Sequence, residues 1–278
     1  MNDKNLQEFV INKFFQVKRT LNLTLPMPLE ATVLSIANLS GNRQKDQLIP
    51  PLKLRCIESQ TDNNPTERET QLKIYCDLKP TDSILDVGCG VGGLTYSLTK
   101  YYNFQGKHEG FEITKEFTEW LKQNTTSKYS NFHFSYANGF CAAYNNTASI
   151  PASKYRFPYS DNSFDIALVG SVFSHMLPEG LENYLSEVTR VLKPNGKCLI
   201  SYFLLTPLRP MDLRDNEIRS RFVDSGKGYS TTGTQYPEDA VAYNQEYILT
   251  LYEKRGLVLE QQIVYCNFQD MVVAKKNN

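Results

Sequence analysis

Hydrophobic and polar positions first follow a helical period and later alternate between strand-like and helix-like segments. Residues 4–21 place apolar side chains at every third or fourth position, which predicts an amphipathic helix. From Thr24 to about Pro65 this pattern breaks up around prolines and a glycine, which predicts an irregular arm outside any sheet. After residue 83, short apolar runs alternate with amphipathic stretches. Such alternation is typical of an α/β domain with a mostly parallel sheet.

Five apolar runs are predicted as the first strands of this sheet. They are Ser83–Val87, Gly106–Ile113, Asn131–Tyr136, Phe164–Gly170 and Lys197–Leu205. The helices expected between them are Gly93–Tyr102, a segment that Thr114 caps and that carries Phe117, Trp120 and Leu121 on one face, and a stripe from Leu181 to Leu192 ended by Pro194-Asn195-Gly196.

Two more strands are predicted near the end, at Leu257–Tyr265 and Gln269–Lys275, with only about three residues between them. A parallel crossover needs about a dozen residues, so these strands must be antiparallel. The predicted fold class is therefore α/β and Rossmann-like: a mostly parallel seven-stranded sheet with one antiparallel strand near the C-terminus and helices on both faces. Residues 1–70 are expected to form a helix and arm that cover the site, and residues 71–278 the main domain, with a lid insertion at 206–247.

Charge and cysteine usage narrow the class of protein. Thirty Lys and Arg residues balance thirty Asp and Glu residues, and no basic run is present, so nothing steers the chain toward nucleic acid or an anionic membrane. No segment approaches the roughly 18 consecutive apolar residues of a membrane helix. The six cysteines include no C-x-x-C pair, which argues against a zinc site or a disulfide framework. We therefore expect a cytoplasmic protein with reduced thiols and no metal.

The stretch ILDVGCGVGG, residues 84–93, ends the first strand and opens a helix. Glycines there let the backbone turn tightly and approach a ligand beside the positive end of a helix. Gly88, Gly90 and Gly93 also satisfy the dinucleotide pattern G-x-G-x-x-G. However, the carboxylate of Asp86 would repel a pyrophosphate, whereas it would attract a ligand that carries an ammonium and a sulfonium. A plain tight turn is the alternative.

Glu112 lies at the end of the second predicted strand, about 20 residues beyond the glycines. An acidic residue at this distance can accept hydrogen bonds from both ribose hydroxyls of a nucleoside. The alternative is a solvated carboxylate at a helix start, where glutamate is common.

Five motifs in this order resemble the class I S-adenosylmethionine-dependent methyltransferases. They are LDVGCGVGG (85–93), GFEI (110–113), FPYSDNSFDIALVGSVFSHM (157–176), YLSEVTRVLKPNGKCLISYFLL (184–205) and QDMVVAKK (269–276). The resemblance covers about residues 70–275. It is most similar to stand-alone bacterial members with a signature close to SVFTHM after strand four and an earlier P-P-x-x-L-R element, here SVFSHM (171–176) and PPLKLR (50–55).

The resemblance implies a binding site for the cofactor S-adenosylmethionine. Its residues would be Asp86, Gly88, Cys89, Gly90, Glu112, Asn138, Gly170 and Ser171. The first four would hold the methionine moiety and Glu112 the ribose, while the last two would face the methyl donor. Asn138 departs from the family, whose usual Asp contacts the adenine amino group; an Asn carbonyl can accept the same hydrogen bond without a charge.

Methyl transfer is an in-line displacement in which the protein mainly aligns the acceptor and excludes water. His175, five residues beyond Gly170, is the candidate for the base that removes a proton from the acceptor, and a packing role is the equal alternative. His108 and His133 lie within predicted strands and are expected to be structural. Arg55 is weighed either as a partner of the cofactor carboxylate or as an arm residue.

We therefore expect methyl transfer to an oxygen or nitrogen of a small molecule, a saccharide or a lipid precursor, by a monomer or homodimer. The acceptor pocket would come from the N-terminal region and from Thr206–Tyr247, which is rich in tyrosine and arginine. The alternatives are a nucleic-acid methyltransferase, a non-catalytic relative used for binding or assembly, and, most remotely, a dehydrogenase.

Overall fold

The computed structural model describes residues 48–51, 54, 67–141, 145–207, 219–233, 235–266 and 268–278. The predicted N-terminal helix and most of the predicted arm, Arg55 included, lie outside the described residues. The division into an arm, a main domain and a lid therefore stays a prediction.

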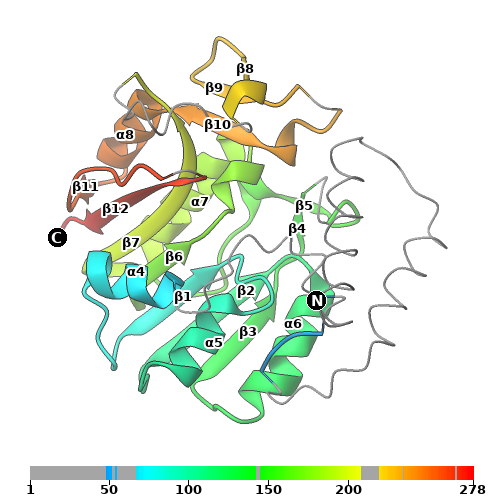
Figure 1. Cartoon of the computed structure of the whole chain (residues 1–278), viewed down its shortest axis with the longest axis vertical. Coiled ribbons are helices and arrows are strands. Elements are labelled where there is room, and N and C mark those ends of the chain that lie inside the picture. Colours follow the sequence, from blue (N-terminus) through cyan, green and yellow to red (C-terminus); the bar gives the residue numbers. More distant parts are fainter. Residues whose placement is uncertain are drawn as a thin grey trace, which may run out of the picture.

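A mostly parallel sheet forms the centre of the molecule (Figure 1). Five parallel strands lie in the order β3 (Phe132–Tyr136), β2 (Lys107–Glu112), β1 (Ser83–Val87), β6 (Phe164–Val169) and β7 (Leu192–Leu205). Strand β12 (Asp270–Lys276) pairs antiparallel with β7, and β11 (Leu257–Leu259) pairs antiparallel with β12. These seven strands confirm the predicted Rossmann-like sheet with an antiparallel strand near the C-terminus.

Three further strands extend this sheet to ten, beyond the seven predicted. Strand β7 is long enough for two partners: β12 pairs with its residues 197–202, and β10 (Val241–Asn244) pairs in parallel with its residues 203–205. Strands β9 (Tyr229–Thr231) and β8 (Val223–Asp224) then add in antiparallel order. The described part of the expected lid insertion is therefore hydrogen-bonded to the main sheet.

Strand β11 is shorter than the predicted strand Leu257–Tyr265. After Leu259 the chain leaves the regular ladder: the nitrogen of Glu260 still donates to the carbonyl oxygen of Val273 at 3.0 Å, and an isolated bridge joins Val264 to Met271. Asp270 contributes to this course because its Oδ1 accepts a hydrogen bond from the backbone nitrogen of Cys266 at 3.1 Å. The predicted link of three residues was therefore wrong, while the antiparallel pairing was correct.

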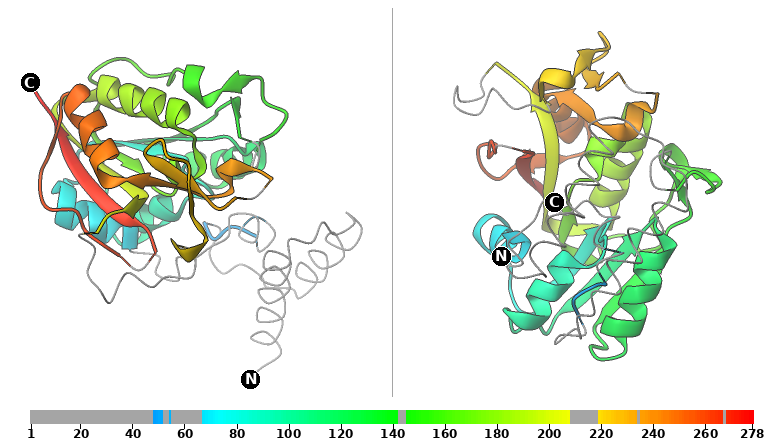
Figure 2. Two further views of the ribbon diagram at one scale, coloured as in Figure 1. Left: turned by 90° about the horizontal axis from the view of Figure 1, so that it is seen from above. Right: turned by 45° about the vertical axis from the view of Figure 1, so that its right-hand side comes forward.

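Helices cover both faces of the sheet (Figure 2). On one face lie α4 (Glu67–Cys76), α5 (Gly93–Lys100) and α6 (Lys115–Leu121), and on the other α7 (Pro178–Val191) and α8 (Gln245–Lys254). Successive residues of a strand point to opposite faces, so Ile84 packs with the first layer and Leu85 with the second. No helix of the described residues has the length and apolar character needed to cross a membrane.

Short elements complete the described structure. They are the π-helical turn η1 (Lys122–Thr126), the 3-10 turns η2 (Ala152–Lys154), η3 (Phe173–His175), η5 (Arg219–Arg221) and η6 (Pro237–Asp239), and a two-stranded parallel sheet of β4 (Gly139–Phe140) and β5 (Ile150–Pro151).

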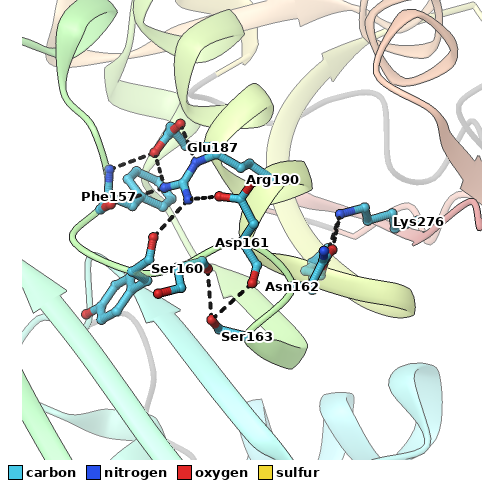
Figure 3. A network of polar contacts seen from close by, with 10 residues as sticks. Phe157, Ser160, Asp161, Asn162, Ser163, Glu187, Arg190 and Lys276 are labelled. Carbon is cyan, nitrogen blue, oxygen red and sulfur yellow. Dashed lines mark hydrogen bonds and ion pairs between the residues drawn. The ribbon is translucent and has the colours of Figure 1, made fainter.

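Arg190 on α7 ties this helix to the loop that leads into β6 (Figure 3). Its guanidinium donates to both carboxylate oxygens of Glu187, with Nη2–Oε2 at 2.6 Å and Nε–Oε1 at 2.9 Å. It also donates to Oδ1 of Asp161 at 2.7 Å and to the carbonyl oxygens of Tyr159 and Phe157 at 2.8 and 3.1 Å. Every nitrogen of the fork thus has an acceptor in the loop or on its own helix.

We expect Arg190→Met to lower the free energy of unfolding by about 2–3 kcal/mol, because it leaves two loop carbonyls without this donor and the half-buried Glu187 carboxylate without its cationic partner, with only the Phe157 nitrogen still bonded to it. Arg255→Met is the matched control: Arg255 and Glu182 are 3.9 Å apart with both side chains more than a third exposed, so the loss should stay below about 1 kcal/mol. Urea unfolding of the three proteins checks this. Equal losses in both variants would show that the Arg190 network contributes no more than a surface pair.

Candidate functional site

The loops that follow β1, β2 and β6 meet at the carboxyl edge of the sheet, where open α/β sheets bind ligands. In the loop after β1, Gly88, Gly90 and Gly92 have φ angles of 65°, 54° and 88°, which L side chains rarely adopt. The backbone nitrogens of Gly88 and Cys89 both donate to the carbonyl oxygen of Phe111, at 2.9 and 3.1 Å. The loop is therefore fastened to the end of β2.

This loop also packs directly on the segment after β6. A Cβ atom added to Gly88 would come within 2.5 Å of Cγ2 of Val172. The left-handed backbone and the close approach both require glycine at this position. The glycine motif and the SVFSHM motif, which are far apart in sequence, are thus in contact.

Glu112 is buried at the end of β2, and two backbone groups orient its carboxylate. Oε2 accepts from the nitrogen of Gly90 at 3.0 Å, and Oε1 accepts from the nitrogen of Thr114 at 2.8 Å. Burial raises the pKa of Glu112 above its usual value, against the opposing effect of these hydrogen bonds. A carboxylate oxygen can accept more than one hydrogen bond, so each oxygen can also take a hydroxyl. These two acceptor oxygens fit the two neighbouring hydroxyls of a ribose.

Asp86 is 2% exposed and lies on β1, next to β2. On β2, Nε2 of His108 is 3.7 Å from Oδ2 of Asp86. This distance exceeds hydrogen-bond range. His108 has no exposed surface, its ring stacks on Phe132, and neither ring nitrogen has a hydrogen-bond partner in the structure.

The expectation that His108 is structural therefore left out its position beside a candidate cofactor residue. The strand register explains this position. Ile84 pairs with His108 and Asp86 with Gly110, so Asp86 and His108 project from the same face of neighbouring strands. Residue spacing in the sequence indicates each strand but not this register.

Gly170 and Ser171 follow β6 and lie beside a residue that the sequence analysis missed. A Cβ atom on Gly170 would overlap the guanidinium of Arg68, which α4 brings across the end of β6. Arg55, which was weighed as a partner of the cofactor carboxylate, lies outside the described residues. Arg68 is the basic side chain that the structure places at this edge.

His175 ends the turn η3, and its Nδ1 lies 3.0 Å from the carbonyl oxygen of Glu238 in η6. A carbonyl can only accept, so Nδ1 carries the proton, and in the neutral ring Nε2 keeps the lone pair. Burial lowers the pKa of His175 below 6.5, which favours this neutral form at neutral pH. The hydroxyl of Tyr243 donates to the carbonyl oxygen of Met176, so a second contact joins the same two segments.

Asn138 lies after β3, at the same edge as Glu112, but its side chain is exposed and donates to Oγ of Ser149 at 3.2 Å. Its contact with adenine stays a prediction. Nearby, the sequence analysis missed Asn145, which is 9% exposed and donates from Nδ2 to the carbonyl oxygen of Ile113 at 2.9 Å and to the hydroxyl of Tyr136 at 3.0 Å. Asn145 thus links the ends of β2 and β3.

The remaining candidates lie apart from this edge or do not form a site. His133 is half exposed, and its Nδ1 is 3.5 Å from Oε1 of Glu109. Within the described ranges, no group of three or more His, Cys, Asp or Glu residues is placed to hold a metal ion.

Comparison with known proteins relates the part of the chain that contains this edge to a protein family. Residues 85–200 match the model of the methyltransferase domain family. The chain is 30% identical over 125 residues to the 2-phytyl-1,4-naphtoquinone methyltransferase of Trichormus variabilis, a match that covers 45% of this chain and 48% of that protein. The chain thus spans about half the length of the curated relatives it matches.

Solved structures share the fold at low sequence identity. The crystal structure of the PH0226 protein from Pyrococcus horikoshii has a TM-score of 0.54 and 21% identity, and the match covers 80% of this chain and 93% of that one. The 1,6-didemethyltoxoflavin-N1-methyltransferase of Burkholderia thailandensis, solved with bound 1,6-didemethyltoxoflavin and S-adenosylhomocysteine, has a TM-score of 0.53 and 14% identity, and the match covers 92% of this chain and 93% of that one. Residues 85–200 thus match a methyltransferase domain, and the Rossmann-like sheet that contains them is the fold that these solved structures share.

Proposed function

We propose that this chain transfers the methyl group of S-adenosylmethionine to an oxygen or nitrogen of a small-molecule acceptor. The observation that carries the proposal is the Glu112 carboxylate, which the nitrogens of Gly90 and Thr114 hold at the end of β2. It is oriented like an acceptor for a ribose and lies against the glycine loop.

The charge of the site favours a cationic cofactor over a dinucleotide. Asp86 and Glu112 are buried carboxylates on neighbouring strands, and both lie at or near the carboxyl edge. Two such groups repel a pyrophosphate and favour a ligand with an ammonium and a sulfonium. The cofactor would supply an activated methyl group, and the chain would bind it and orient the acceptor. The roles assigned are Asp86 toward the ammonium, Glu112 toward the ribose, and Gly170 and Ser171 toward the methyl group.

His175 is proposed as the base that accepts the acceptor's proton. Its Nδ1 donates to the carbonyl oxygen of Glu238, so the lone pair of the neutral ring lies on Nε2. Glu238 belongs to the segment expected to form the acceptor lid. Docking of this segment therefore also orients the imidazole ring of His175. A role in packing alone is the alternative, and the variant His175→Gln below distinguishes the two roles.

Two of the similar proteins are named as methyltransferases of small molecules, 2-phytyl-1,4-naphtoquinone and 1,6-didemethyltoxoflavin, which supports a small-molecule acceptor here. The balanced charge of this chain agrees with such an acceptor. The tyrosines of the lid segment divide into two groups. Tyr243 is fully buried and stacks on Tyr247 at 5.9 Å between ring centroids, so it holds the segment in place. Tyr236 is 48% exposed and stays a candidate for acceptor contact.

The first experiment is a calorimetric titration of the whole chain with S-adenosylhomocysteine, with NAD as the control. Binding of the first ligand alone supports the cofactor assignment, and release of the same product then serves to screen acceptors. A gel shift with RNA and DNA at low salt tests the nucleic-acid alternative. Binding without turnover of any acceptor would favour the non-catalytic alternative.

Asp86→Asn is expected to weaken S-adenosylhomocysteine binding by about thirtyfold, or about 2 kcal/mol, because it removes the charge opposite the ligand ammonium. The matched control is Asp165→Asn on the neighbouring strand, since Asp165 bonds to Ser83 and Lys193 at the amino end of the sheet. Calorimetry should find the control unchanged. An affinity in Asp86→Asn equal to wild type would remove Asp86 from the cofactor site.

Glu112→Gln is expected to weaken the same ligand by about tenfold and to abolish the pH dependence of binding that arises from this carboxyl. Burial favours the protonated form of Glu112, so the carboxylate is lost at a higher pH than its ordinary pKa of 4.5. The affinity of wild type should therefore fall as pH decreases from neutrality toward 4.5. Titrations across this range check the slope, and an identical slope in Glu112→Gln would assign it to another group.

His175→Gln is expected to lower kcat by about a hundredfold with any acceptor found, while S-adenosylhomocysteine affinity stays within about threefold. Because burial lowers the pKa of His175, the acid limb of the wild-type rate profile should lie below pH 6.5. Rates measured against pH check both points. A variant with the full rate and the same acid limb would reduce His175 to a packing residue.

A further inference from the structure

Ser171 has an unusual backbone conformation at the point where β6 ends. Its φ angle is 58°, in the left-handed region. Three other non-glycine residues of the described part share a positive φ, and they are Asp77, Asn162 and Asn195. Asp and Asn tolerate this conformation because their short polar side chains bond locally, whereas Ser does so less readily. Something outside the local chain must therefore hold Ser171 in place.

All three polar groups of Ser171 are hydrogen-bonded to other segments. Its backbone nitrogen donates to Oγ of Ser201 on β7 at 2.8 Å. Its carbonyl oxygen accepts from Oγ of Ser174 in η3 at 3.2 Å. Its own Oγ donates to Oε1 of Gln269, just before β12, at 3.1 Å. The conformation is thus fixed from three sides.

Gln269 connects these partners to one another. Its Oε1 accepts from Ser201 Oγ at 2.6 Å as well as from Ser171, and its Nε2 donates to Ser174 Oγ at 3.0 Å. Each of the three hydroxyls donates once, and those of Ser174 and Ser201 also accept once, so the network is closed. Gln269 is 8% exposed and Ser174 has no exposed surface. Only a side chain with both an acceptor and a donor closes it, which an amide provides.

We propose that Gln269 is a positioning residue that holds the Ser171 turn, and with it the residues facing the methyl donor, in the geometry for methyl transfer. Its influence extends to both reacting groups. Ser171 follows Gly170 on the donor side, and Ser174 directly precedes the proposed base His175. This inference rests on the proposed function, because it assigns the same edge of the sheet to the cofactor.

The test uses the full chain and S-adenosylhomocysteine as the probe. Gln269→Met keeps a side chain of similar length but removes every hydrogen bond, and we expect it to weaken binding about tenfold, or about 1.4 kcal/mol. This loss corresponds to the penalty that an L-residue meets in the left-handed conformation once its support is gone. Gln261→Met is the matched control. Nε2 of Gln261 has no hydrogen-bond partner in the structure, so this substitution should leave the affinity for S-adenosylhomocysteine unchanged.

Rescue separates positioning from simple stabilisation. Glycine adopts a positive φ without strain, so in Ser171→Gly the hydrogen bonds of Gln269 are no longer needed to hold residue 171 in the left-handed conformation. We therefore expect the double variant Gln269→Met/Ser171→Gly to recover affinity to within about threefold of the single variant Ser171→Gly. Thermal unfolding of each variant is measured in parallel. A role of Gln269 in global stability alone would lower the melting temperature but would show no such rescue.

Each outcome decides one question. If wild type fails to bind S-adenosylhomocysteine, the proposed function falls, and the inference with it. If wild type binds and Gln269→Met binds equally well, or if Ser171→Gly gives no rescue, the inference alone is overturned. Should Gln269→Met fail to fold, Gln269→Glu takes its place, because it keeps the acceptor oxygens and loses the donor to Ser174. It should then show a loss that the same glycine relieves.

Discussion

The buried carboxylate of Glu112 is the contact on which the candidate site depends. It joins the end of β2 to the glycine loop after β1 through the nitrogen of Gly90. The nitrogens of Gly88 and Cys89 in the same loop donate to the carbonyl oxygen of Phe111, one residue earlier on β2. Two neighbouring parallel strands therefore hold the left-handed glycines in one arrangement, and the carboxylate that orients the loop is also the group proposed to bind the ribose.

The antiparallel strand β12 supports the site from the other side. Asp270, its first residue, accepts hydrogen bonds from the nitrogen of Leu204 and from that of Cys266, each at 3.1 Å. Its neighbour Gln269 accepts from Ser171 and Ser201. Two adjacent side chains thus fix the upper part of β7 and the turn after β6 together. This gives the reversed strand a role beyond closing the edge of the sheet.

Strand β7 joins the cofactor half of the sheet to the lid segment. Its residues 197–202 pair with β12, and its residues 203–205 pair with β10. Strand β10 leads into Tyr243, which bonds to Met176, and the preceding turn η6 bonds to His175. One continuous strand therefore sets the distance between the turn proposed to face the methyl donor and the segment expected to cover the acceptor.

Local pattern was sufficient wherever a segment's own side chains decide its state. The run Ser83–Val87 was predicted with the bounds that the structure has, because both faces of β1 are buried and three of its five residues, Ile84, Leu85 and Val87, are apolar. The glycine turn after β1 and the position of Glu112 at the end of β2 were also predicted, since tight turns and strand ends leave a residue signature, while their cofactor roles stay predictions. Strand β11 was predicted too long, because its end depends on the pairing with β12 and on the hydrogen bond between Asp270 and the nitrogen of Cys266.

The tertiary structure alone decided which distant groups meet. Gln269 bonds to Ser171 across 98 positions, Arg68 crosses the end of β6, and His108 lies beside Asp86 because of the register between β1 and β2. The sequence by itself determined seven strands of the sheet and the glycine turn after β1, since these follow from periodicity and turn chemistry, and its motifs indicated the family resemblance. The support of the site did not follow, because strand register and the hydrogen bonds between segments are set only when the whole sheet assembles.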